Sequence, residues 1–347
     1  MPSPSNAGRP PARPHPDSPT TPVWADVPAR TSRRGDFWIT GDRVEKDGAH
    51  YQAGPMYVAW EAPVDVTQAL PIVLVHGGTL QGTEWGDTPD GRPGWAQRFV
   101  EAGHAVFVVD RPGHGRSPYH PDILGPTSPP FSYERGRAVY FPEGGGETQW
   151  PFDPSDADAF DAFIAAYGPM PADLAHAQSL DADRLSRLLD RIGPAIVVTH
   201  SASGPDGWLL VDRRPDLVRA IVTVEPMGPA FGHTPGIGTL TWGLTAAPMR
   251  FDPPRATPDE VRAAAAETLR IPSLAGLPVA LVTGETSVFA TFAPSIIGFL
   301  EHAGARVDHL HMPAHGIHGN GHGMIYEKNS DDVLAVVLAW LDGLRTR

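Results

Sequence analysis

The sequence predicts an α/β fold in which helices cover both faces of a mostly parallel central sheet and a cap or lid is inserted. First, short apolar runs rich in β-branched residues alternate with segments of helical periodicity, as in repeated strand–helix–strand units. Second, runs such as residues 196–198 are apolar throughout, which is typical of strands buried on both faces. Third, residues 118–180 and 227–256 are too long for simple connections and are expected to be lids or binding loops. The 347 residues are 41% hydrophobic, which is ample for a packed core.

The same pattern gives the order of the elements. Residues 1–33 are rich in proline, serine and arginine, and we expect a disordered tail there, before an ordered domain over residues 34–347. The expected strands are residues 37–39 and 56–60, as an antiparallel entry to the sheet, then 72–75, 105–109, 195–198, 220–224, 279–282 and 307–310. The expected helices are one ending near Gly103, one capped by Asp181 and closed by Gly193, one after Ser201, and two near 260–269 and 331–341.

The first long insertion is rich in aromatic residues. We interpret residues 118–180 as a cap over a cleft, and the alternative is a surface excursion that these rings only anchor. The aromatic residues are Phe131, Tyr133, Tyr140, Phe141, Trp150, Phe152, Phe160, Phe163 and Tyr167.

The most informative stretch is the strand that ends at Ser201. A parallel strand that turns sharply into a helix at a serine exposes the hydroxyl in a cleft, and only small residues fit two positions away on either side. Thr199 and Ser203 occupy the positions that carry glycine in the usual G-x-S-x-G pattern. The alternative is a serine that only caps an ordinary helix. A nucleophilic serine needs a base, a group that orients the base, and donors for an oxyanion, all from neighbouring strand ends.

Two other strand ends carry glycine-rich loops. Residues 76–82 follow one strand, and the backbone N–H of Gly78 is the expected oxyanion donor, together with that of Ala202 just after the serine. Another strand runs into a turn that begins at Asp110, and we expect Asp110 and Arg116 to hold this turn as a structural feature.

The orienting acid is expected at the end of the strand over residues 220–224. Glu225 ends that strand, and a buried carboxylate is costly unless it is paired or has a chemical role. Glu285, after the next strand, is the competing candidate.

The base is expected from a glycine-rich loop, residues 311–323, that holds four histidines. His322, between glycines and before the last helix, is favoured, while His318 and His315 stay open as alternatives. A metal cluster formed by the histidines from His309 to His322 is a further alternative, although no carboxylate lies at ligand spacing within the loop.

The composition of the chain excludes several classes of partner and of functional site. The net charge of −13 and the lack of basic runs argue against nucleic acid or a membrane surface as a partner. With no cysteine, the chain has no disulfide, thiolate metal site or cysteine nucleophile. We expect no cofactor, a small-molecule partner and, since no signal peptide is seen, a cytoplasmic location; export and a homodimer stay open.

Taken together, these motifs resemble the α/β-hydrolase superfamily over roughly residues 35–345, and within it a group of bacterial esterases of the esterase 713 type. The closer resemblance rests on local motifs: His76-Gly77, Thr88-Pro-Asp-Gly-Arg-Pro-Gly-Trp95, Thr199-His-Ser201, Val224-Glu-Pro226, His318-Gly-Asn-Gly-His322 and Glu327-Lys-Asn329. Esterases of this type carry two adjacent cysteines where this chain has Gly78-Thr79.

The resemblance implies a serine esterase with Ser201 as nucleophile, His322 as base and Glu225 as orienting acid, and with Gly78 and Ala202 donating to the oxyanion. A carboxylic ester is then the expected substrate. A lactone, thioester or amide would suit the same residues, and a ligand-binding protein that keeps the fold without turnover is the alternative from another class.

Overall fold

The computed structural model of the protein describes residues 29–141 and 148–344. Most of the predicted disordered tail, residues 1–28, lies outside the described residues. The end of the predicted tail is wrong, because Ser32 and Arg33 already belong to the first strand and pair with Pro63 and Ala62.

A single eight-stranded sheet organises the domain, and its order is β1-β4-β6-β5-β7-β8-β11-β12. The six strands from β6 to β12 are parallel, whereas β1 and β4 are antiparallel to their neighbours. The predicted fold class is therefore confirmed. The strands are β1 (Ser32–Ile39), β4 (Met56–Pro63), β5 (Ile72–Val75), β6 (Val106–Asp110), β7 (Ala195–His200), β8 (Val218–Val224), β11 (Pro278–Thr283) and β12 (Arg306–His311).

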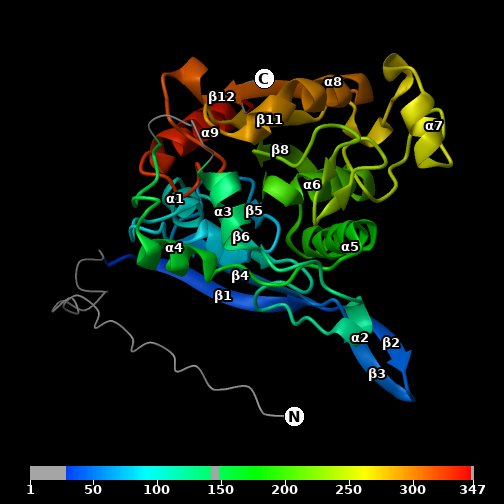
Figure 1. Ribbon diagram of the computed structural model, residues 1–347, viewed down its shortest axis with the longest axis horizontal. Coiled ribbons are helices and arrows are strands. Elements are labelled where there is room, and N and C mark those ends of the chain that lie inside the picture. Colours follow the sequence, from blue (N-terminus) through cyan, green and yellow to red (C-terminus); the bar gives the residue numbers. More distant parts are fainter. Residues whose placement is uncertain (1–28, 142–147, 345–347) are drawn as a thin grey trace, which may run out of the picture. The chain divides into compact units, whose positions relative to one another are not determined.

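Helices cover both faces of this sheet (Figure 1). On one face, α1 (Trp95–Glu101) and α9 (Ser330–Leu344) pack against the side chains that include Leu74 and Val198. On the other face lie α5 (Leu174–Ile192), α6 (Gly204–Arg213) and α8 (Ala293–Ala303). Each face of the sheet has its own hydrophobic core. Successive strand residues contribute to these cores in turn, as Val73 and Leu74 do, because strand side chains point to opposite faces. Each large side chain buried in this way contributes about 1.5–3 kcal/mol.

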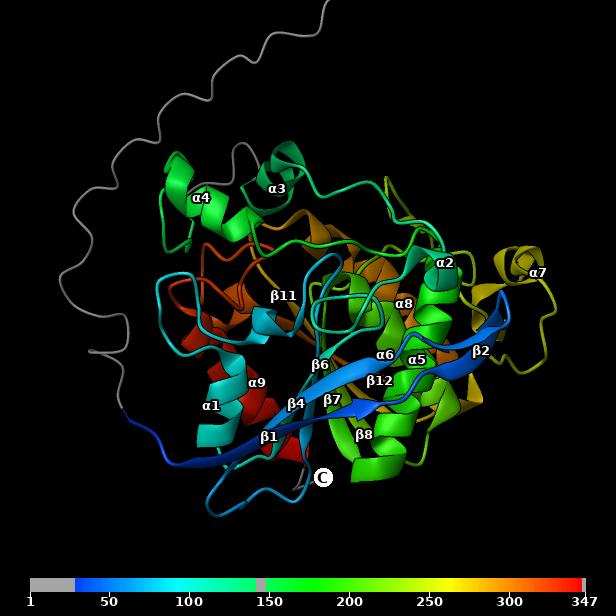
Figure 2. The ribbon, with the colours of Figure 1, turned by 90° about the horizontal axis from the view of Figure 1, so that it is seen from below.

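The two long insertions carry small elements of their own. The first holds α2 (Pro121–Leu124), α3 (Tyr133–Tyr140) and α4 (Ala157–Ile164), and α3 and α4 lie together at one end of the domain (Figure 2). Its rings join the core on the α1 and α9 face through Tyr140, Trp150 and Phe160. The second holds the two-stranded ribbon of β9 (His233–Thr234) and β10 (Gly238–Thr239).

Two predicted helices differ from the observed ones. Helix α5 begins at Leu174, where Asp173 accepts a hydrogen bond from the His176 N–H at 3.0 Å, so Asp181 is not its cap. Asp181 is buried within the helix and pairs with Arg111 at 2.9 Å. The helix expected over residues 260–269 is instead α7 (Pro258–Ala263), followed by a 3-10 turn at Ala266–Thr268.

A hairpin between β1 and β4 is missing from the sequence interpretation. It pairs β2 (Asp42–Lys46) with β3 (Ala49–Ala53) through the turn Asp47-Gly48. Both turn residues have positive φ, 52° and 75°, as a two-residue turn of the Asp-Gly type requires. Its signal was therefore present in the sequence.

Candidate active site

Ser201 stands at the apex of the turn between β7 and α6. Its φ is 56°, in the left-handed region that a residue with a side chain adopts only when the surroundings enforce it. Thr199 and Ser203 are hydrogen-bonded parts of this turn. The Thr199 hydroxyl donates to Thr223 Oγ1 at 2.9 Å, and Ser203 Oγ donates to the Val75 carbonyl at 2.9 Å. The two residues that replace the usual glycines thus tie the turn to the neighbouring strands.

His322 faces the serine. Its Nε2 lies 3.0 Å from Ser201 Oγ, and its ring stacks on Phe289 with centroids 3.9 Å apart. Burial, and next the charge of His200, lower the pKa of His322 well below its ordinary value. The imidazole is therefore neutral at physiological pH and able to accept a proton from the serine.

Glu225 lies on the other side of the His322 ring. The Gly284 N–H donates to its Oε1 at 2.6 Å, and the Ser287 hydroxyl donates to its Oε2 at 2.5 Å. Its Oε2 is 3.8 Å from His322 Nδ1, a contact too long for a hydrogen bond, and Nδ1 has no other partner among the described residues. Such contacts often tighten only when substrate is bound. Burial raises the pKa of Glu225 to about 7, although its two hydrogen bonds oppose the rise.

The competing residues lie away from the serine. Glu285 is exposed, and its Oε2 accepts from the Gly319 N–H at 2.9 Å and faces His318 Nδ1 at 3.2 Å. His311 ends β12 and bonds to Thr283 at 3.0 Å. Within residues 29–141 and 148–344, no group of three or more His, Asp or Glu side chains is arranged to hold a metal ion. The structure brings His322 and Glu225, rather than His318 and Glu285, to Ser201.

The expected oxyanion donors lie next to each other. A Cβ added to Gly78 would be 3.1 Å from the Cβ of Ala202, and both residues line the cavity that contains Ser201 and His322. The Arg111 guanidinium donates to the Gly77 carbonyl at 2.7 Å and so fixes the loop before Gly78. Arg111 is itself buried between Asp181 and Asp206. The prediction that Asp110 and Arg116 hold the turn after β6 is confirmed, since Arg116 pairs with Asp110 at 2.7 Å.

Comparisons with known proteins identify the family of the chain. Residues 71–248 match the family described as alpha/beta hydrolase fold. The chain is 35% identical to a "Probable secreted lipase phiG" of Fungal sp. (strain ATCC 74256) over 318 residues, which are 85% of this chain and 87% of the relative. A structure titled "The Atomic Resolution Structure of a Novel Bacterial Esterase" has a TM-score of 0.68 at 24% identity, covering 94% of this chain and 98% of that one.

The chain belongs to the α/β-hydrolase fold family. The predicted resemblance is confirmed, and the protein is a hydrolase. Among the helices of the described residues, none has the length and apolar character of a membrane span.

Sequence reasoning missed a buried contact between Glu84 and His200, which lies behind the expected triad residues. Glu84 Oε1 contacts His200 Nδ1 and accepts from the Tyr326 hydroxyl at 2.9 Å, while its Oε2 accepts from the Gly77 N–H at 2.6 Å. On its other side, His200 Nε2 lies 3.0 Å from the His322 carbonyl oxygen. Although burial opposes it, the Glu84 carboxylate raises the pKa of His200. The two partners are far apart in the sequence, so no local pattern links them.

A second missed network fixes the loop that carries His322. Asn320 Nδ2 donates to Glu327 Oε2 at 2.6 Å and to Asn329 Oδ1 at 2.7 Å, and the Gly321 N–H donates to Glu327 Oε1 at 3.0 Å. The Arg92 guanidinium donates to the Glu327 carbonyl at 2.8 Å. The motifs at residues 88–95 and 327–329, which carried the closer resemblance, therefore act by holding this loop.

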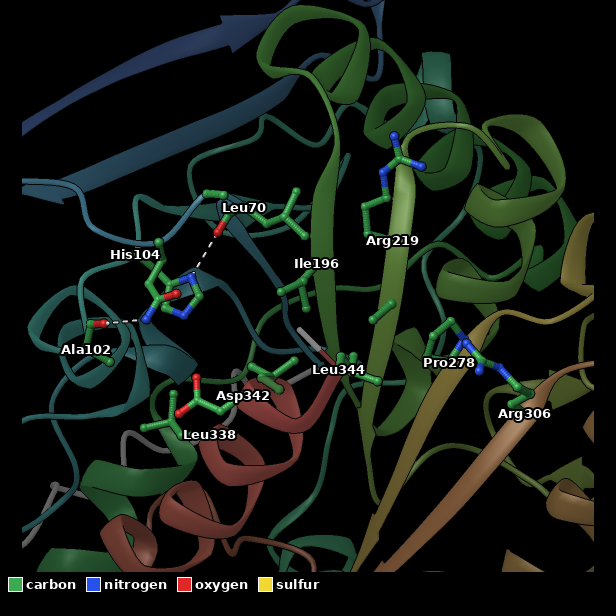
Figure 3. Close-up of a pocket in the computed structure, with 14 residues that line it drawn as sticks. Leu70, Ala102, His104, Ile196, Arg219, Pro278, Arg306, Leu338, Asp342 and Leu344 are labelled. Atoms are coloured by element: carbon green, nitrogen blue, oxygen red, sulfur yellow. Dashed lines mark hydrogen bonds between the residues drawn. The ribbon is translucent and has the colours of Figure 1, made fainter. Parts of the chain in front are cut away.

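Ser201 and His322 line a cavity of about 450 Å³, a size suited to a small ligand. Both long insertions line it, through residues that include Phe131 and Tyr167 of the first and Met227 and Ile237 of the second. A separate cavity of about 490 Å³ lies at the opposite end of the strands (Figure 3). Its lining includes Arg219 and residues near the starts of neighbouring strands, so it is distant from the carboxyl-end loops where Ser201, Glu225 and His322 lie.

Proposed function

We propose that this α/β-hydrolase cleaves carboxylic esters of small molecules through an acyl-enzyme intermediate, with Ser201, His322 and Glu225 as its triad. The observation that carries the proposal is the contact of 3.0 Å between His322 Nε2 and Ser201 Oγ. Ser201 lies at a strained turn, and the other ring nitrogen of His322 faces the buried carboxylate of Glu225. The fungal relative is named a lipase and the bacterial one an esterase, and both names denote enzymes that cleave carboxylic esters.

Each step uses a group with a suitable position. Ser201 Oγ attacks the ester carbonyl carbon while His322 Nε2 takes the hydroxyl proton, and the N–H groups of Gly78 and Ala202 stabilise the oxyanion. Collapse of the intermediate breaks the ester bond, and His322 gives its proton to the leaving alcohol. Water then attacks the acyl-enzyme with His322 as base, which releases the acid and restores the serine. Glu225 holds the His322 ring and stabilises the imidazolium that forms twice in the cycle.

The test combines turnover and labelling. Wild type should hydrolyse p-nitrophenyl esters and be labelled by a fluorophosphonate, whereas Ser201→Ala should lose about 10⁴-fold or more in kcat and all labelling. The screen includes esters of increasing acyl length, with lactones, thioesters and amides beside them, because the triad alone does not distinguish these bonds. Ser179→Ala, in α5 and outside the cavity, is the matched control and should behave as wild type.

Identical behaviour of wild type and Ser201→Ala on every substrate, with no labelling, would identify a ligand-binding homologue and overturn the proposal. The cytoplasmic location remains a prediction, since the fungal relative is named as a secreted lipase.

A further inference from the structure

The cavity that contains Ser201 has a charge that the reaction itself does not use. Arg135 of α3 lines it, and none of its described lining residues is an aspartate or glutamate. The other lining residues are mainly aromatic, aliphatic or small, and the polar ones are Thr79, Ser201, His233, Thr234 and His322. A guanidinium stays protonated at every pH at which the protein is folded, so this cavity carries a permanent positive charge.

Arg135 is half-buried without an anionic partner in the described part of the chain. No ion pair to its side chain is found there, and burial lowers its pKa, with only the nearby Tyr140 opposing this. Arg137, one position beyond Gly136 on the same helix, instead donates to the Pro154 carbonyl at 2.8 Å and lies over Phe160, away from the cavity lining. A cation withdrawn from water without a counter-charge is unfavourable unless a ligand supplies the charge.

The guanidinium is held between the two insertions. It lies over the Phe131 ring at 5.4 Å, and its Nη1 would be 3.2 Å from a Cβ placed on Gly236 in the turn between β9 and β10. Phe131 stacks on Tyr167 with centroids 4.2 Å apart. This packing restricts the side chain, and a guanidinium that is fixed in advance binds a carboxylate with less loss of conformational entropy.

One aromatic wall joins Arg135 to the catalytic base. After Phe131 and Tyr167 comes Tyr140, whose hydroxyl accepts from the Tyr167 hydroxyl at 2.7 Å, and the Tyr140 ring lies 5.5 Å from that of His322. The positive charge and the reacting atoms therefore lie along one wall of a single cavity, separated by several rings. A substrate that reaches both must carry its anionic group several bonds away from the ester.

We infer that the substrates of this enzyme are esters that carry a second, ionised carboxylate, which the Arg135 guanidinium binds while Ser201 attacks the ester carbonyl. Half-esters of linear dicarboxylic acids are the simplest members of this class. The aromatic wall accommodates the apolar spacer between the two carboxyl groups, and the Arg135 guanidinium donates two parallel N–H···O bonds to the carboxylate. The inference rests on the proposed esterase function.

The experiment compares charge at constant shape. Monomethyl esters of glutarate, adipate and suberate are each paired with the methyl ester in which a neutral carboxamide replaces the free carboxylate, and hydrolysis is followed by pH-stat at pH 8. In wild type, the ratio of kcat/KM for acid over amide should reach about 10 to 100 for at least one spacer length. Arg135→Gln should reduce this ratio to about one, Arg135→Lys should retain part of it, and Arg137→Gln should retain all of it. Because each ratio is measured within one preparation, loss of folded protein cancels.

A second measurement does not depend on folding of the variants. Adipate, but not adipamide, should inhibit wild-type hydrolysis of a neutral p-nitrophenyl ester competitively, and added salt should weaken this inhibition. A wild-type ratio of one or less at every length, an unchanged ratio in Arg135→Gln, or equal inhibition by the two compounds overturns the inference. If neutral esters are still cleaved in a Ser201-dependent way, only the charge preference is wrong; if no ester is cleaved, the proposed function is wrong as well.

Discussion

Three residues at the carboxyl ends of the strands stand on left-handed backbone. These are Thr79 in the loop after β5, Ser201 and Glu225, with φ of 61°, 56° and 47°. Each such conformation costs on the order of 1–3 kcal/mol for a residue with a side chain, so the surrounding hydrogen bonds must enforce it. At Glu225 they do, since the carboxylate binds Gly284 and Ser287 of the next loop. Two of these three residues, Ser201 and Glu225, are members of the proposed triad.

The raised pKa of Glu225 predicts the pH dependence of the rate. Burial raises this pKa to about 7, so the carboxyl is neutral at lower pH and cannot stabilise a charged His322. The pKa of His322 is lowered, so the base is available on both sides of this transition. We expect kcat/KM to rise with pH through about 7 and then level off, and a pH–rate profile of Ser201-dependent hydrolysis measures it.

A variant of Ser287 tests whether Glu225 is the group that controls the pH profile. Its hydrogen bond lowers the pKa of Glu225, so Ser287→Ala should raise that pKa further and move the rising limb to higher pH by about one unit. Ser186→Ala is the matched control, because the Ser186 hydroxyl donates to the Ala182 carbonyl within α5 and has no other partner in the part of the chain that the structure describes. A limb at the same pH in Ser287→Ala and wild type would show that another group controls the profile.

At the scale of elements, the sequence predicted features that depend on neighbouring residues and missed contacts between residues that are far apart in the chain. A few consecutive residues were enough to identify the strands, the serine turn at residues 199–203 and the histidine-rich loop. The start of α5 was missed because Asp181, a plausible cap by residue type, is used instead for a buried pair with Arg111. The pair of Glu84 and His200 was missed because only the folded sheet brings its partners together.

That pair joins three segments, and its removal should affect turnover more than binding. His200 contacts the carbonyl of His322, and Glu84 accepts from the N–H of Gly77, the residue before the proposed oxyanion donor Gly78. We expect His200→Asn to lower kcat about 10-fold or more while KM changes less than about threefold, because the substrate cavity is unchanged but the base and the oxyanion loop lose their common support. The rate is normalised to the serines that a fluorophosphonate titrates, so that unfolded protein does not count.

Coupling between the partners distinguishes positioning from a general loss of stability. Glu84→Gln should have a similar effect, and the double variant should be little worse than either single variant, because both changes remove one interaction. His315→Asn, at an exposed position, serves as the control. Fully additive losses in kcat per titrated serine would contradict a shared role.

At the scale of the whole molecule, the sequence predicted the architecture because five of the six parallel strands contain a clear apolar run, and the carboxyl ends of parallel strands necessarily share one edge of the sheet. It could not predict which of several carboxylates and histidines would converge there. Glu225 and Glu285 follow adjacent strands, and only the fold turns one inward and leaves the other exposed with His318. Choice among such neighbours depends on loop conformation, which local sequence specifies weakly.

The inward carboxylate also links catalysis to the stability of the fold. The pKa of Glu225 rises from 4.5 to about 7 on folding, so the folded state disfavours the ionised carboxylate. Ionisation of this group therefore lowers the stability of the fold. Between those two values the unfolded chain loses the proton before the folded chain does, so the free energy of unfolding falls as pH rises. Glu327, with a pKa also raised to about 7 by burial, acts in the same direction.

Glu225→Gln should therefore stabilise the protein while it impairs the reaction. At pH 8 the variant avoids a buried charge that costs up to about 3 kcal/mol, so its Tm should exceed that of wild type by about 2 °C or more. At pH 5 the wild-type carboxyl is neutral, and the two Tm values should converge. Glu285→Gln, which changes an exposed carboxylate whose pKa the Gly319 N–H lowers, should show no such gain at pH 8. Thermal unfolding at both pH values measures the difference. A lower Tm for Glu225→Gln at pH 8 would mean that its ionised carboxylate is stabilised in the folded state, which contradicts both this prediction and the pH–rate profile derived from the same pKa.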